Sequence, residues 1–174
     1  MKNKSLFTII LIFLTFCFFI FLKSLDNSNI YIPPQNLDKK LVAFSTTTLF
    51  DSKSISSKDL FVEDKIYLLN LWASWCAPCR IEHKNLMTLS NNQSIEIIGL
   101  NYRDSIDNAK SFIDKYGNPY SEILIDKDGT IAINLGAIGV PETYVINKNK
   151  NILKKITGPI NSKHMKEIEN LLPK

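Results

Sequence analysis

The fold is decided by an apolar run, Lys65-Ile-Tyr-Leu-Leu-Asn-Leu-Trp72, which leads directly into Ala73-Ser-Trp-Cys-Ala-Pro-Cys-Arg80. A nearly continuous apolar run is typical of a strand that is buried on both faces. Pro78 suits the first turn of a helix, because no N–H is needed there, and a helix is therefore predicted over 77–90. The segment predicts a buried strand that turns into a helix, with two cysteines at the turn.

The rest of the domain continues the alternation of strands and helices. A second apolar strand is predicted over 95–100, and a helix from Asp104 to Gly117 carries its apolar residues on one face. Further predictions are an opening strand near 40–44, a strand over 122–125, a turn over 126–129, a hairpin of 143–146 with 152–156, and a last helix over 162–172. This order predicts an α/β fold with a central mixed sheet flanked by helices on both faces.

An uncharged run over 6–22 precedes the domain, with Thr8 and Thr15 as its only polar residues. As a helix it rises about 25 Å, the short end of what crosses a hydrocarbon core of about 30 Å. The alternative is a cleavable signal peptide, but Lys23 follows the run and no small-x-small site is present. We therefore expect an uncleaved transmembrane helix, with Cys17 as a lipid-facing apolar residue.

Positive charge indicates the orientation of this helix. Lys2 and Lys4 precede the run, so the positive-inside rule places the N-terminus in the cytoplasm and the rest outside it. We expect residues 1–22 to form the cytoplasmic N-terminus and the anchor, and the polar, proline-bearing stretch 23–38 to form a linker. Residues 39–174 then form one domain on the periplasmic side of a bacterial inner membrane.

Composition excludes some classes of function. The chain of 174 residues has 45% hydrophobic and 22% charged residues, which is ordinary for a globular domain. Its 21 basic and 17 acidic residues give a net charge of +4, too small for a nucleic-acid-binding surface. A tethered monomer is the simplest expectation for the assembly.

The two cysteines of the domain carry the chemistry. A thiolate of Cys76 at a helix N-terminus meets free N–H groups and the positive end of the helix dipole, so we expect an exposed nucleophile with a lowered pKa. Cys79 lies one helical turn further and can resolve a mixed disulfide. A zinc site would need two more ligands, with His83 and His164 the only histidines, and an inert structural disulfide is a further alternative. Redox exchange is favoured, without a metal or a bound cofactor.

Several segments resemble a known family. The stretch 69–80 resembles the active-site segment of the thioredoxin superfamily, and 139–143 resembles its cis-proline segment. Four further segments, 80–83, 99–104, 117–120 and 135–139, resemble the membrane-anchored thiol:disulfide interchange proteins of cytochrome c maturation, the DsbE/CcmG type. The resemblance covers nearly all of 39–174 and implies a thioredoxin-like fold.

The resemblance also implies roles for residues. Cys76 would attack and Cys79 would resolve, while Pro141 would be the cis-proline facing the disulfide. The backbone of Val140 would pair with an extended substrate. Trp75 is expected to shield the disulfide and to contact the substrate.

Two acidic residues match active-site positions of the family. A carboxylate of Glu82 or Glu142 near Cys76 would disfavour the thiolate and make the pair a better reductant. Asn70 stands where thioredoxin has a buried acid and cannot accept the Cys79 proton, so Glu82 is the candidate acceptor. Surface positions in solvent are the alternative for both glutamates, and His83 is expected to be a partly exposed helix residue.

The resemblance implies a periplasmic reductant that acts on apocytochrome c, or on the maturation protein that handles its haem site. A membrane electron donor would re-reduce the disulfide. The alternatives are a tethered reductase with another client, such as copper-site assembly, and a copper-binding chaperone. The Cys76–Cys79 spacing is one residue short for the chaperone.

Overall fold

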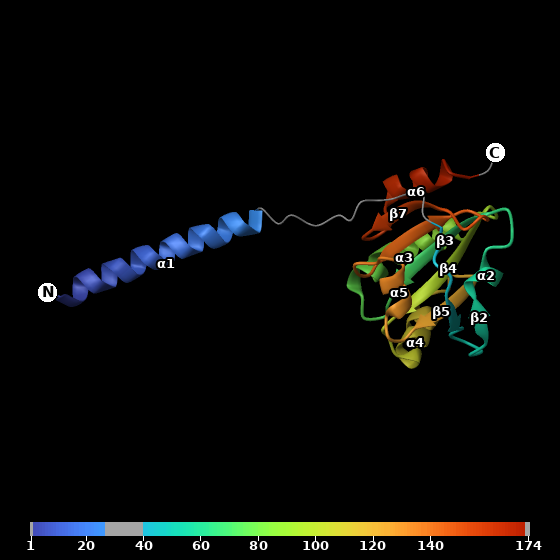
Figure 1. Cartoon of the computed structure of the whole chain (residues 1–174), viewed down its shortest axis with the longest axis horizontal. Helices are drawn as coiled ribbons and strands as arrows, with labels where there is room; N and C mark the ends of the chain where they lie inside the picture. Colours follow the sequence, from blue (N-terminus) through green and yellow to red (C-terminus); the bar gives the residue numbers. More distant parts are fainter. Residues whose placement is uncertain (1, 27–39, 173–174) are drawn as a thin grey trace. The chain divides into compact units, whose positions relative to one another are not determined.

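The computed structural model of the chain describes residues 2–26 and 40–172. The chain divides into two units, 1–34 and 35–174 (Figure 1). Most of the linker predicted over 23–38 lies outside the described residues.

The N-terminal unit contains one helix, α1 (Lys2–Asp26), which extends beyond the predicted run at both ends. Its segment Lys4–Lys23 is long and apolar enough to cross a membrane. The apolar side chains of this segment, and the thiol of Cys17, are exposed. The helix therefore has the surface that a lipid environment would cover, while its retention in the mature protein stays a prediction.

A five-stranded mixed sheet forms the centre of the domain, in the order β5-β4-β3-β6-β7. The central strand β3 (Ile66–Trp72) pairs in parallel with β4 (Ile95–Tyr102), which pairs in parallel with β5 (Glu122–Asp126). On its other side β3 pairs antiparallel with β6 (Glu142–Ile146), which pairs antiparallel with β7 (Ile152–Thr157). The predicted mixed sheet is confirmed.

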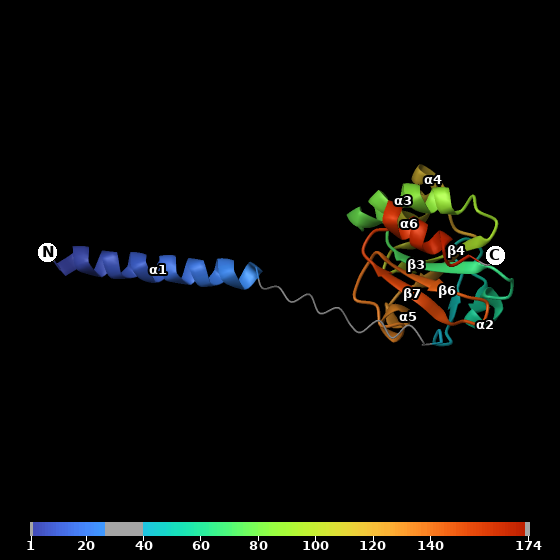
Figure 2. The same cartoon turned by 90° about the horizontal axis from the view of Figure 1, so that it is seen from above.

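Helices cover both faces of the sheet, as Figure 2 shows. One face carries α3 (Ala77–Leu89), α4 (Ile106–Tyr116) and α6 (Ser162–Glu169), and the other carries α2 (Ser57–Leu60) and α5 (Thr130–Asn134). The crossovers β3-α3-β4 and β4-α4-β5 run in the same direction along the sheet. Because such crossovers are right-handed, α3 and α4 lie on the same face.

Alternation along β3 divides the core in two. Leu68 and Trp72 pack with both cysteines in the core beneath α3, whereas Leu69 and Leu71 pack in the opposite core beneath α5. All seven residues of β3 are buried, which explains its uninterrupted apolar pattern.

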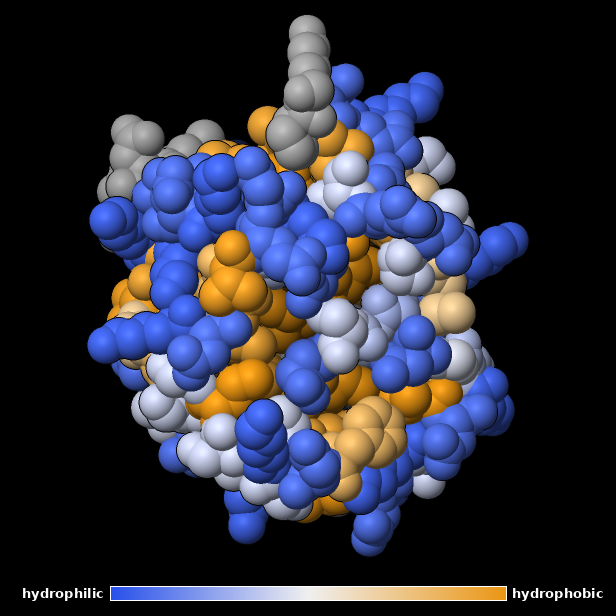
Figure 3. Space-filling model, turned by 90° about the vertical axis from the view of Figure 1, so that its right-hand side faces the viewer, coloured by the Kyte–Doolittle hydropathy of each residue, from blue (hydrophilic) through white to orange (hydrophobic). Residues whose placement is uncertain are grey.

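The face of the molecule that Figure 3 shows is mostly hydrophilic, with smaller hydrophobic areas between the hydrophilic ones.

The prediction of an opening strand near 40–44 is wrong. Lys40 forms only an isolated bridge with Asn151, and the first strands are β1 (Ser45–Thr47) and β2 (Ser54–Ser56), which pair with each other. Strands of three residues are too short for a periodic pattern, so the sequence does not reveal them.

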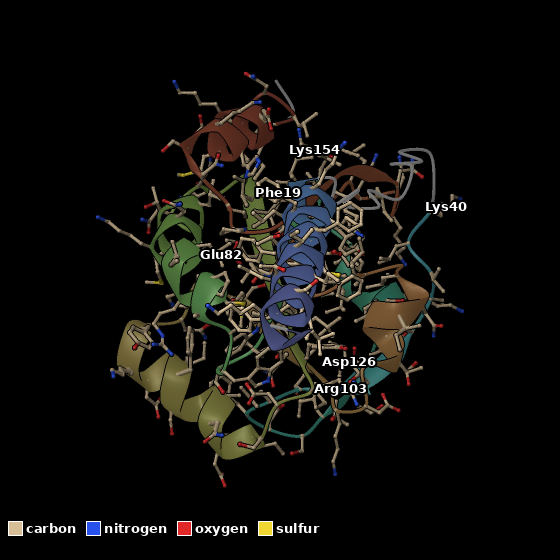
Figure 4. All side chains as sticks on the ribbon, turned by 90° about the vertical axis from the view of Figure 1, so that its left-hand side faces the viewer. Phe19, Lys40, Glu82, Arg103, Asp126 and Lys154 are labelled. Carbon is tan, nitrogen blue, oxygen red and sulfur yellow. A yellow bond between two sulfur atoms is a disulfide. The ribbon has the colours of Figure 1, made fainter. Side chains whose placement is uncertain are left out.

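The predicted turn over 126–129 is present but leads into a helix, α5, that was not predicted. Gly129 has a φ of 82°, and the Asp126 carboxylate accepts hydrogen bonds from the N–H groups of Ile131 and Ala132 in the first turn of α5. The Asp126 carbonyl accepts from the N–H of Arg103, and the two residues lie at the same end of the domain in Figure 4. Five residues are too few for helical periodicity, so only the turn was predicted.

Candidate active site

The two cysteines lie where β3 turns into α3, and they form a disulfide with a Cα–Cα distance of 5.3 Å. Cys76 is the N-cap of α3, and its Sγ accepts a hydrogen bond of 3.1 Å from the N–H of Cys79. Pro78 lies in the first turn of the helix. A thiolate at Cys76 would therefore face a helix N-terminus and a donating N–H group, both of which stabilise negative charge.

The expectation of an exposed Cys76 needs correction. Cys76 and Cys79 are each only 3% exposed to solvent, because both are packed in the core beneath α3. Val140 packs against the same core. Exposure therefore does not distinguish the two sulfurs. Their positions on the helix do, since Cys76 is the cap and Cys79 lies within the first turn.

The segment before β6 lies against the core that contains the cysteines. The Val140–Pro141 peptide bond is cis, Pro141 is buried, and its carbonyl accepts a hydrogen bond of 2.9 Å from the N–H of Gly158. Val140 packs against the core of the cysteines and against the opposite core. The resemblance had implied this cis bond.

Glu82 is buried on the helix that begins at the cysteines, so the alternative of a solvated glutamate is wrong. It lies on α3 one turn beyond Cys79 (Figure 4) and has 0% exposure. Its Oε1 accepts from Asn70 Nδ2 over 2.9 Å, and its Oε2 accepts from the N–H of Ile160 over 2.7 Å. Burial raises the pKa of Glu82 to about 7, although both hydrogen bonds oppose that rise.

Asn70 connects Glu82 to a buried polar network. Its Nδ2 also donates to Thr143 Oγ1 over 3.0 Å, and its Oδ1 accepts from the Tyr120 hydroxyl over 3.0 Å. The hydroxyl is fully buried, which raises the pKa of Tyr120 well above its usual value. Tyr120 and Thr143 lie 50 and 73 residues from Asn70 along the chain, and the sequence did not indicate these contacts.

Glu142 is also buried rather than solvated, but its partners belong to a different part of the domain. Its Oε2 lies 2.9 Å from Lys155 Nζ and 3.3 Å from the Tyr144 hydroxyl oxygen, while its Oε1 accepts from the N–H of Ile138 over 3.0 Å. Tyr144 packs in the core opposite to α3. The structure thus places Glu82 on the cysteine helix α3, whereas Glu142 is paired with Lys155.

The two tryptophans of the active-site segment differ in exposure. Trp75 is 58% exposed, and its Nε1 donates to the carbonyl of Arg103 over 3.2 Å. Trp72 is buried with the cysteines and stacks on Tyr120 with a centroid distance of 5.5 Å. An apolar indole surface thus faces solvent next to Cys76, as expected for a residue that contacts a substrate.

Known thiol:disulfide interchange proteins are similar to this chain in sequence. The Redoxin family matches residues 37–172. The thiol:disulfide interchange protein DsbE of Escherichia coli strain K12 is 36% identical over 139 residues, which cover 77% of this chain and 75% of that protein. The chain belongs to the Redoxin family, in its DsbE-type branch.

Two further comparisons extend this assignment. The thiol:disulfide interchange protein HelX of Rhodobacter capsulatus is 44% identical over 98 residues, or 56% of this chain and 55% of HelX, so the match spans little more than half of HelX. The crystal structure of a DsbF homologue from Corynebacterium diphtheriae has a TM-score of 0.66 and 25% identity, and covers 80% of this chain and 90% of that one. The thioredoxin-like fold is thereby confirmed.

His83 is buried, so the expectation of a partly exposed helix residue is wrong. It is 4% exposed rather than partly exposed, since α4 packs over it: its ring lies 5.1 Å from that of Phe112 and 6.3 Å from that of Tyr116. Its Nε2 lies 3.0 Å from the carbonyl oxygen of Gly117. Burial lowers the pKa of His83, which favours the neutral ring and a structural role.

Asp104 holds the active-site turn and was predicted only as the start of a helix. Its Oδ2 accepts from the N–H of Ser74 over 2.6 Å and from Asn101 Nδ2 over 3.1 Å, and its Oδ1 accepts from the Ser74 hydroxyl over 2.8 Å. Helix α4 starts only at Ile106, after the N-cap Ser105. An acid at the end of β4, next in the sheet to β3, was the available signal for this contact.

Proposed function

We propose that the protein is a thiol:disulfide oxidoreductase that reduces a disulfide in a client of cytochrome c maturation. The client would be apocytochrome c, at its Cys-x-x-Cys-His haem site, or the maturation protein that handles that site. The Cys76–Cys79 disulfide at the N-terminus of α3 carries the proposal. The membership of the DsbE-type branch supports the same reaction.

The first step is an attack by the reduced protein. The Cys76 thiolate attacks one sulfur of the client disulfide, and the other client sulfur leaves as a thiolate. The helix N-terminus and the Cys79 N–H favour the thiolate form of Cys76. The product is a mixed disulfide between Cys76 and the client.

The second step releases the client. The Cys79 thiol loses its proton, and its sulfur attacks Cys76, so that the Cys76–Cys79 disulfide forms and the second client thiolate leaves. In sum, two electrons pass to the client, whose two thiolates take up protons from water, and the dithiol loses the protons of Cys76 and Cys79. Glu82 is the proposed acceptor of the Cys79 proton, directly or through a water, because it lies one turn away and has a pKa of about 7.

The buried carboxyl group of Glu82, on the same helix as the cysteines, also supports the direction of the reaction. Negative charge on Glu82 disfavours a cysteine thiolate nearby, which destabilises the reduced dithiol and makes it a better reductant. A reduction potential near that of thioredoxin, about −270 mV, or moderately above it, would agree with this direction. A potential near −120 mV, that of a strong periplasmic oxidant, would contradict it.

The proposed reaction needs no bound cofactor, because the dithiol itself carries the two electrons. Among residues 2–26 and 40–172 no group of three or more His, Cys, Asp or Glu residues could hold a metal ion. A dithiol protein of the membrane would re-reduce the disulfide. We place the domain, as a monomer, on the periplasmic side of the inner membrane, anchored through α1.

Trapping of the mixed disulfide tests this function. The full-length Cys79→Ser variant in detergent, after reduction, is expected to form a stable adduct with an oxidised Cys-x-x-Cys-His peptide, because no second thiol can release it. Cys76→Ser is expected to form none, and the wild-type protein is expected to release reduced peptide. If the peptide reacts with neither variant and the wild-type protein does not reduce it, the proposed client is wrong.

A further inference from the structure

The loop 135–140, which leads into the cis bond at Pro141, is held by side chains from the two neighbouring strands. The Tyr144 hydroxyl donates to the carbonyl of Leu135 over 3.1 Å, and Lys155 Nζ donates to the carbonyl of Gly136 over 2.8 Å. The N–H of Ile138 donates to Glu142 Oε1 over 3.0 Å. Three side chains of β6 and β7 thus bind three backbone groups of one short loop.

These three side chains also bind each other. Lys155 Nζ lies 2.9 Å from Glu142 Oε2 and 5.4 Å from the centre of the Tyr144 ring, and Tyr144 and Lys155 are direct partners in the β6–β7 ladder. The Glu142 side chain is 1% exposed and that of Lys155 is 15% exposed. A buried carboxylate is costly without a cation, and Lys155 supplies that cation while Glu142 binds the loop.

Apart from these side chains, the loop is held by the N–H groups of Gly136 and Ala137, which donate to carbonyls of α5, and by packing of Leu135 and Ala137 against the core that contains Tyr144. Gly136 and Gly139 are exposed, and an added Cβ at either position would meet nothing within 4 Å. Ile138 is 58% exposed although its N–H is bound to Glu142. At Gly136 and Ile138 the backbone is therefore held from the sheet by the polar side chains of Lys155 and Glu142, while the Ile138 side chain faces solvent.

The end of this loop reaches the core that contains the cysteines. Val140 packs against the core that contains Cys76 and Cys79 and also against the core that contains Tyr144. A shift of the loop would move the Val140 backbone, which the family resemblance assigns to pairing with an extended client as an added strand. A displacement of about 1 Å at such a contact can slow a reaction by a factor of about 100.

We propose that Lys155 is a positioning residue for the client: together with Glu142 it holds the loop 135–140 in the conformation that presents the Val140 backbone to an extended peptide. This inference rests on the proposed function and adds a residue that does not touch the reacting sulfurs. It also changes the expectation for Glu142, whose paired charge acts on the loop rather than on the Cys76 thiolate.

The two lysines of β7 provide a matched test. Lys155→Met removes the contacts to Gly136 and Glu142, whereas Lys154→Met removes an ion pair with Glu167 of α6. Successive residues of a strand point to opposite faces of the sheet, so the two lysines test different faces. Each full-length variant is reduced and then assayed with two oxidants: an oxidised Cys-x-x-Cys-His peptide, and hydroxyethyl disulfide, which has no peptide backbone. The reduction potential of each variant is measured as well.

Lys155→Met is expected to lower kcat/KM for the peptide about tenfold, mainly through KM, because the loop is displaced. The rate with hydroxyethyl disulfide and the reduction potential should stay unchanged. Lys154→Met should match the wild-type protein with both oxidants, and Lys155→Arg should restore most of the peptide rate. Equal losses with both oxidants, or no loss with the peptide, would overturn the inference.

A second variant guards against unfolding, since Lys155→Met leaves the carboxylate of Glu142 buried and unpaired. The double variant Lys155→Met, Glu142→Gln has no unpaired charge at position 142. Its glutamine can still accept from the N–H of Ile138. The selective loss with the peptide should persist in it, and full peptide activity would contradict a role for Lys155. A wild-type protein inactive with the peptide would refute the proposed function instead.

Discussion

Asn70 Nδ2, on β3, lies 2.9 Å from Glu82 Oε1, on the cysteine helix α3, and both residues are fully buried. An ionised carboxylate only accepts hydrogen bonds, so the donating side of the amide must face it. The Tyr120 hydroxyl occupies the other side of the amide by donating to Asn70 Oδ1. Tyr120 thereby fixes the orientation in which Asn70 stabilises the charged form of Glu82.

Removal of that hydroxyl should raise the pKa of Glu82. In Tyr120→Phe the Asn70 amide is free to turn its oxygen toward Glu82, which favours the protonated acid, so the pKa should lie above about 7. Besides burial, the groups that act on Glu82 are the Asn70 amide and the Ile160 N–H, and Tyr120 is the titratable group coupled to it. Carboxyl carbon NMR of the oxidised full-length protein measures the titration without interference from thiols.

Tyr116→Phe is the matched control, because Tyr116 lies on α4 against His83 and Phe112. Its Glu82 titration should equal that of the wild-type protein. An unchanged or lower pKa in Tyr120→Phe would show that the hydroxyl does not orient the amide.

The pKa of Glu82 should also make stability depend on pH. Its value of about 7 in the folded protein exceeds the usual 4.5, so the stabilising contribution is complete below about pH 4.5 and is lost as the pH rises through about 7. The difference corresponds to ~3 kcal/mol. Glu82→Gln should abolish this decline in urea unfolding of the oxidised protein, and an equal decline in both proteins would assign it to other groups.

Asp104 should be needed for the shape of the active-site turn. Asp104→Ala removes an acceptor for Ser74, Asn101 and the N–H of Ser105, so it should lower the free energy of unfolding by about 2 kcal/mol. The reaction of the disulfide with dithiothreitol should change as well, because the turn before Cys76 loosens. Asp107→Ala, an exposed position in the first turn of α4, should alter neither quantity substantially.

Gly99 should not tolerate a side chain. An added Cβ would lie 2.8 Å from Trp72 Nε1 and 3.1 Å from ring atoms of Tyr120, two rings packed beneath the site. Gly99→Ala should destabilise the fold by ~1–3 kcal/mol, as measured by denaturant unfolding. Gly139→Ala, where a Cβ meets nothing within 4 Å, is the control, and equal stability of the two variants would contradict the close packing.

The central elements could be predicted because their signals are local. The apolar run before Trp72 predicts β3 since every residue of that strand is buried, and Cys76, Pro78 and Cys79 lie within one helical turn, so their proximity follows from helix geometry. The short elements β1, β2 and α5 were missed, because three to five residues carry no usable periodicity.

The sequence by itself determined the strand, the turn and the cysteine pair, together with the family to which they belong. The tertiary structure alone decided what the polar side chains do: two glutamates with the same chemistry are both buried, but Glu82 meets Asn70, and Glu142 meets Lys155. The pKa and the role of a buried carboxyl depend on the dipoles and charges that surround it. Those partners come from distant parts of the chain and are brought together only when the sheet and its helices pack.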